Sequence, residues 1–107
     1  MIVTTTSDVP GRRVARVIGV AKGTTVRTRH LGKNFLAKLS SLFGGEIFDL
    51  TKVVAEAREQ AFDRMIEDAH RMGANAVLAM RFSSAEVMRN AAEIVAYGTA
   101  VVLEEGS

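Results

Sequence analysis

The chain has 107 residues, is 48% hydrophobic and 24% charged, and carries a formal net charge of +2. This composition excludes a disordered chain, and the length fits one domain over residues 1–107. The positive charge is small and scattered, so the sequence has no basic patch of the kind that binds nucleic acid. The absence of cysteine excludes disulfides and thiolate metal sites.

The first third of the chain is rich in β-branched residues. Residues 2–6 predict a short strand, and the Asp, Pro and Gly within 7–11 predict a turn, because proline fixes φ and glycine accepts a positive φ. A second, longer strand is predicted over residues 13–29. Gly19 and Gly23 interrupt it and are the expected sites of a bend or bulge.

Two helices are predicted in the middle of the chain. Residues 34–43 form a short one that a Gly-Gly pair ends, and residues 50–72 form the main one. Asp49 or Thr51 can cap its first amides, and Gly73 stands where a left-handed residue ends a helix. Apolar side chains gather on one side: Leu50, Val54, Ala55, Ala57, Ala61, Phe62, Met65, Ile66, Ala69 and Met72. The opposite side carries Glu56, Glu59, Asp63, Glu67 and His70, so the main helix is predicted to cover a sheet with its back in water.

Two closing strands, 75–83 and 93–103, are apolar on both faces, and 84–90 is predicted to be the loop between them. In the first strand one face carries Ala76, Leu78, Met80 and Phe82. A strand with one wet face alternates apolar and polar residues, so both faces are expected to be covered. One long helix covers one face, and other copies of the chain are expected to cover the second. The elements predict an α+β subunit with an antiparallel sheet.

Residues 1–6 lack the basic and long apolar regions of a secretory signal. The longest apolar stretch, 91–103, is shorter than the ~20 residues of a membrane-spanning helix. We therefore expect a soluble, cytoplasmic protein without a membrane partner. No phosphate loop, nucleophile elbow or triad pattern is present, which favours a non-enzymatic protein.

Five segments carry a family resemblance: Val26-Arg27-Thr28-Arg29-His30, Gly44-Gly45-Glu46, Glu56-Ala57-Arg58-Glu59, Met72-Gly73-Ala74-Asn75-Ala76-Val77 and Ala96-Tyr97-Gly98-Thr99-Ala100-Val101. Together they resemble the YbjQ-like family of small bacterial and archaeal proteins, labelled "putative heavy-metal-binding". The resemblance implies a β-α-β-β subunit, of YbjQ-like or dodecin-like type, that assembles with itself into a ring, typically a pentamer. It implies no established activity. Residues 49–51 and 83–89 depart from the family's usual pattern.

Arg27 and Arg29 form the first candidate site. On a strand they project to the same side, about 6.6 Å apart along the chain. Two guanidinium groups so placed can clamp a phosphate or carboxylate, or form ion pairs with acids of a neighbouring copy. In a ring, symmetry would gather one such pair from each subunit around an axis.

The second candidate is a metal site. The two histidines of the chain do not suffice for a soft-metal site within one subunit, but His30 and Glu46 from several subunits could share a divalent ion such as zinc. Asp63, Glu67 and His70 are an alternative on one helical stripe. The simpler interpretation of that stripe is a solvated face.

Arg58 is the third candidate, because its helical position falls inside the apolar arc. An unpaired buried guanidinium costs several kcal/mol, so this side chain must either reach water or meet an acid. Glu46 and Glu93 are the expected partners. Arg58 is then either part of a packing ion pair or the charged wall of a ligand pocket between subunits.

Overall fold

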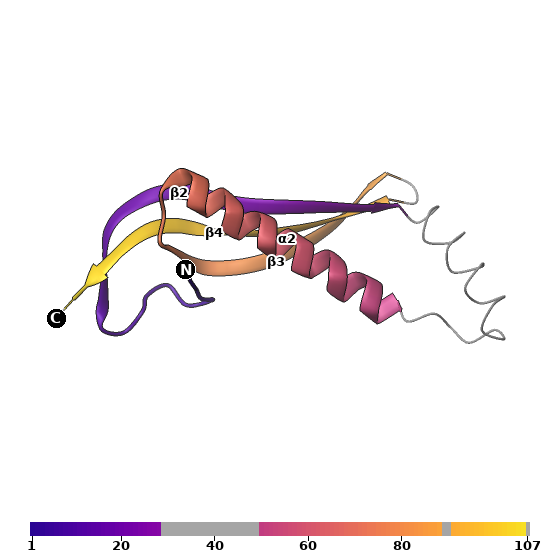
Figure 1. Cartoon of the computed structure of the whole chain (residues 1–107). Coiled ribbons are helices and arrows are strands. Elements are labelled where there is room, and N and C mark those ends of the chain that lie inside the picture. The colour runs from indigo at the N-terminus through magenta and orange to yellow at the C-terminus, as the bar shows by residue number, and fades with distance from the viewer. Residues whose placement is uncertain (29–49, 89–90, 107) are drawn as a thin grey trace, which may run out of the picture.

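The computed structural model describes residues 1–28, 50–88 and 91–106. Within these ranges the elements are β1 (Ile2–Val3), β2 (Arg12–Thr28), α2 (Leu50–Met72), β3 (Ala76–Met88) and β4 (Ala91–Glu105). The strands form one four-stranded sheet in the order β1-β3-β4-β2, and α2 lies across one face of it (Figure 1). The predicted α+β class is confirmed. The predicted short helix over 34–43 lies outside the described residues.

The sheet is mixed rather than antiparallel. β1 pairs in parallel with β3, whereas β4 pairs antiparallel with both β3 and β2. The prediction of an antiparallel sheet is therefore wrong for β1. The physical reason is the path of the chain: β1 lies at one edge of the sheet, and the following segment carries the chain to the opposite edge, where β2 begins.

β2 contains two glycines with different roles. The register against β4 shifts between Val17 and Gly19, which confirms the irregularity predicted at Gly19. No shift occurs at Gly23. A Cβ atom there would overlap the carbonyl oxygen of Ala61 and the amide nitrogen of Met65, so the missing side chain lets the backbone of α2 approach β2.

The hairpin of β3 and β4 is longer than the sequence predicts. Ser84 pairs with Ile94, Glu86 with Ala92, and the ladder continues to Met88. The prediction of a loop is wrong for residues 84–88, because these residues continue the backbone hydrogen bonding of the strands; residues 89–90 lie outside the described residues.

A bulge interrupts β3 at Ala79. Ala79 has a φ of 53°, the left-handed region that alanine rarely adopts, and the register against β4 shifts there. The amides of Ala79 and Met80 donate to the carbonyl oxygens of Thr6 and Thr4, at 2.8 and 2.9 Å. The N-terminal segment therefore holds the bulge in place.

This bulge overturns the predicted shared face of the first closing strand. Ala76 and Leu78 are buried on the face of the sheet away from α2, whereas Met80 belongs to the core beneath α2. Phe82 contributes to a cleft beside α2. The extra residue at Ala79 moves Met80 and Phe82 to the other side of the sheet.

The helix α2 has the predicted bounds, and most of its predicted inner face is buried or half-buried, but Val54, which was predicted there, is 44% exposed. Ala57, Ala61, Met65 and Ala69 are fully buried. The acidic residues of the predicted wet face are exposed, as is His70. At the C-terminus Gly73, with a φ of 88°, donates to His70, and Ala74 donates to Ala69, both at 3.0 Å. This is the Schellman arrangement expected from a glycine after the last turn.

The face of the sheet away from α2 is covered in part by the chain itself. Buried residues there (Ala76, Leu78, Val101 and Leu103) pack with Ile2 and Val9 of the N-terminal segment. At this end the chain itself therefore supplies part of the cover that was expected from another copy. Farther along, Val17 and Val20 are each 64% exposed and Tyr97 is 39% exposed, so an apolar surface lies open. Among the described residues, no helix has the length and apolar character of a membrane span.

Candidate functional site

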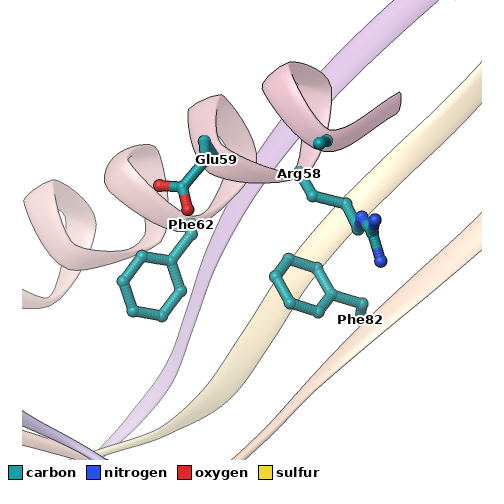
Figure 2. A pocket seen from close by; sticks show the side chains of 5 residues that line it. Arg58, Glu59, Phe62 and Phe82 are labelled. Carbon is teal, nitrogen blue, oxygen red and sulfur yellow. The ribbon is translucent and has the colours of Figure 1, made fainter. Parts of the chain in front are cut away.

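A cleft of about 350 Å³ lies between α2 and β3. Its lining residues are Ala55, Arg58, Glu59 and Phe62 of α2 and Phe82 of β3, and Figure 2 shows the side chains of Arg58, Phe62 and Phe82 extending into the space between helix and strand. The cleft thus combines one cation, one anion and two aromatic rings.

The cleft exists because α2 is held toward the opposite edge of the sheet. At the β2 edge Nη1 of Arg64 donates to the carbonyl oxygen of Thr24 at 2.5 Å, and the amide of Lys22 donates to Oδ2 of Asp68 at 3.0 Å. The close approach at Gly23 lies in the same region. These contacts fix α2 over β2 and β4, so the helix-facing side of β3 is left partly open at Phe82.

Arg58 projects from α2 toward Phe82, and its side chain is exposed (Figure 2). Arg58 lies at the edge of the helix-sheet contact, where its guanidinium reaches water. No ion pair joins it to Glu93, and Glu46 lies outside the described residues. Within the described ranges Arg58 therefore keeps a guanidinium without a carboxylate partner, whose planar fork of donors matches an oxyanion.

The two rings make the apolar part of the cleft. Phe62 is half-buried beside the core, and Phe82 is 45% exposed. The sequence placed Phe62 on the inner face of the helix but gave no functional role to Phe82. An aromatic residue in an apolar strand is ordinarily predicted to be a core residue. Only the bulge at Ala79 and the offset of α2 bring Phe82 beside Arg58.

The other predicted site residues are not brought to this cleft within the described structure. Arg27 lies in β2 with its backbone opposite Ala92, and Arg29, His30 and Glu46 lie outside the described residues. The helical stripe of Asp63, Glu67 and His70 is exposed on the back of α2. In the ranges 1–28, 50–88 and 91–106, no group of three or more potential metal ligands is present.

Comparison with known proteins gives a family match over almost the whole chain. A family model described as "Putative heavy-metal-binding" matches residues 1–104. A UPF0145 protein of Thermus thermophilus is 56% identical over 104 residues, which cover 97% of this chain and 91% of the relative. A UPF0145 protein of Clostridioides difficile is 49% identical over 105 residues, which cover 98% and 94%.

A solved structure shares the fold. The crystal structure of a protein with unknown function from Pediococcus pentosaceus, described as belonging to the DUF74 family, superposes with a TM-score of 0.63. The match covers 97% of this chain and 98% of that chain at 14% identity, which supports the fold alone.

Proposed function

Because this chain belongs to the YbjQ-like family described as "Putative heavy-metal-binding", we propose that it is a non-enzymatic, cytoplasmic homo-oligomer that binds a small ligand, and that this ligand is an anion held in the cleft between α2 and β3. The observation that supports this ligand is Arg58, whose exposed guanidinium lines the cleft without a carboxylate partner among the described residues. We assign no catalytic residue.

The chemistry of the cleft favours binding over catalysis. A guanidinium is always protonated near neutral pH, so it stabilises an anion but does not exchange protons with it. Its neighbours in the cleft, Phe62 and Phe82, supply neither a nucleophile nor a base. Glu59 is exposed to water and has no positioned partner in the described structure that would turn it into a general base.

Titration calorimetry with acetate, 3-phenylpropionate, phosphate and small dicarboxylates tests the anion proposal, with Arg58→Gln as the diagnostic variant. Arg58→Gln removes the charge at an exposed position and should weaken binding. Arg16→Gln is the matched control, because Arg16 is an exposed arginine on β2 away from the cleft. Binding that survives Arg58→Gln, or no binding of any anion by the parent protein, would exclude the anion function of this cleft.

Self-association is supported by the open surface of Val17, Val20 and Tyr97 on the far face of the sheet. Exposed apolar patches of this kind mark interaction surfaces. We propose that copies of the chain cover it in a ring, with five subunits as the family resemblance implies. Arg27 and Arg29 would then add positive charge at the junctions. A Val17→Asp/Val20→Asp variant should dissociate in multi-angle light scattering, whereas a parent protein that is monomeric at micromolar concentration would refute the assembly.

Metal binding is the second candidate, favoured by the family description. His30 and Glu46 would supply imidazole and carboxylate ligands, from several subunits, to a divalent ion such as zinc. Metal analysis of untagged protein offered zinc and manganese tests it. Stoichiometric metal that is lost in His30→Ala supports the site. Protein that takes up no metal refutes the hypothesis, and uptake unchanged by His30→Ala removes His30 from it.

A further inference from the structure

We propose that the ligand of the cleft between α2 and β3 is a monocarboxylate with an aromatic or branched apolar body. Its carboxylate binds Arg58, and its apolar body lies against Phe62 and Phe82. This assignment rests on the proposed anion-binding function and specifies the chemical class of the anion.

The apolar walls are the first reason. Phe62 comes from the helix and Phe82 from the strand, so the two rings border the cleft from different layers of the fold (Figure 2). Phe82 is 45% exposed, and Ala55 adds a small apolar surface to the same cleft. An inorganic anion at Arg58 would leave these surfaces in water, whereas a ligand with an apolar body would cover them and gain from their burial.

The spacing of the charged and apolar groups is the second reason. Arg58 and Phe62 are four residues apart on α2, so their side chains leave the same face of the helix about 6 Å apart. A carboxylate joined to a ring through a short alkyl chain spans about one helical turn. The guanidinium fork binds such a carboxylate through two parallel hydrogen bonds.

Glu59 is the third reason, because it decides the charge of the ligand. This carboxylate lines the same cleft as Arg58. A second negative charge on the ligand would lie near Glu59 as well as Arg58, and like charges repel. The cleft therefore favours a monoanion over a dicarboxylate or a phosphate dianion.

The size of the cleft suits a small ligand. About 350 Å³ is near the lower end of the range of roughly 300–1,000 Å³ that small-molecule sites occupy. A single ring with a short acidic chain fits this space. A nucleotide, with its base, sugar and several phosphate charges, does not suit either the volume or Glu59.

Calorimetric titration of the full chain with four probes tests the ligand class. The probes are 3-phenylpropionate, propionate, 3-phenylpropanol and inorganic phosphate, which separate the contributions of the ring and the charge. We expect 3-phenylpropionate to bind at least about tenfold more tightly than each of the others, since each lacks one of the two recognised features or carries excess charge.

Variants then assign the two parts of the ligand to residues. Arg58→Gln should weaken binding of 3-phenylpropionate by about tenfold or more, and Arg58→Lys by less, because lysine retains the charge without the fork. Phe82→Ala should weaken 3-phenylpropionate but leave propionate unchanged. Phe82→Leu repeats this test with an apolar side chain retained. Arg16→Gln should bind like the parent protein.

The outcomes separate this inference from the function on which it rests. If phosphate or propionate binds as tightly as 3-phenylpropionate, and Arg58→Gln abolishes that binding, the apolar-acid inference fails while the anion function stands. If none of the anions binds, both fail. If Phe82→Ala and Phe82→Leu, each with an unchanged circular dichroism spectrum, bind 3-phenylpropionate like the parent protein, the assignment of the apolar body to this cleft is overturned.

Discussion

Replacing Gly23 by alanine tests how α2 is seated on the sheet. A Cβ atom at this position would overlap the carbonyl oxygen of Ala61 and the amide nitrogen of Met65, and would lie 2.7 Å from Cβ of Arg64. Two of these three atoms belong to the helix backbone, so a change of side-chain rotamer cannot remove the overlap. The helix itself must move away from β2.

The sign of the effect separates this steric contact from the general effect of removing a glycine. Where the backbone and the space are compatible, Gly→Ala stabilises a protein by about 0.4–1 kcal/mol, because the unfolded chain loses conformational freedom. Overpacking of a well-packed contact costs about 1–3 kcal/mol. Gly23 is not among the residues with a positive φ, so no backbone strain adds to the balance. We expect Gly23→Ala to lower the free energy of unfolding by about 1–3 kcal/mol.

Urea unfolding followed by far-ultraviolet circular dichroism, at one fixed protein concentration, measures this change. The midpoint should fall while the slope with urea stays the same. Lys22→Ala is the control, since it alters an exposed neighbour on the same strand and should change stability by less than about 0.5 kcal/mol. A Gly23→Ala protein as stable as the parent, or more stable, would refute the close seating of α2 on β2.

Three further predictions concern the fold. Met65→Ala should lower the free energy of unfolding by about 2–5 kcal/mol in the same urea assay, because Met65 is fully buried, whereas Val54→Ala, at a side chain 44% exposed, should lower it clearly less. Equal losses of stability in the two variants would contradict the core assignment. Asn75→Ala should lower the free energy of unfolding by about 1 kcal/mol, since Nδ2 of Asn75 donates to the Leu103 carbonyl oxygen at 2.9 Å and Oδ1 accepts from the Leu103 amide at 2.7 Å. An unchanged urea midpoint would argue against both bonds. Ala79→Gly should leave the thermal midpoint equal or higher, because relief of the left-handed alanine offsets the added flexibility of glycine; a clear decrease would count against the bulge.

The main helix could be predicted from local sequence patterns alone. Its bounds at Leu50 and Met72, its cap at Gly73 and its acidic back agree with the structure. These features depend on residues within a few positions of one another, through the helical period, the turn at the C-terminus and the preference of charged side chains for water. The long strands were also predicted from their β-branched and apolar residues, and the irregularity at Gly19 from the glycine itself. So was family membership, which rests on segments spread along the whole chain.

The side of the sheet on which each β3 residue lies, and the residues that line the cleft, depend on contacts between segments far apart in the chain. The bulge at Ala79 depends on hydrogen bonds that its amides donate to the carbonyl oxygens of Thr4 and Thr6, more than seventy residues earlier. No local pattern encodes such a pairing, yet it transfers Met80 and Phe82 to the side of α2. The parallel edge strand β1 and the cover by Val9 follow from the same N-terminal segment. Arg58 was singled out from its helical position, but its neighbour Phe82 was not, because their proximity depends on where the helix rests on the sheet.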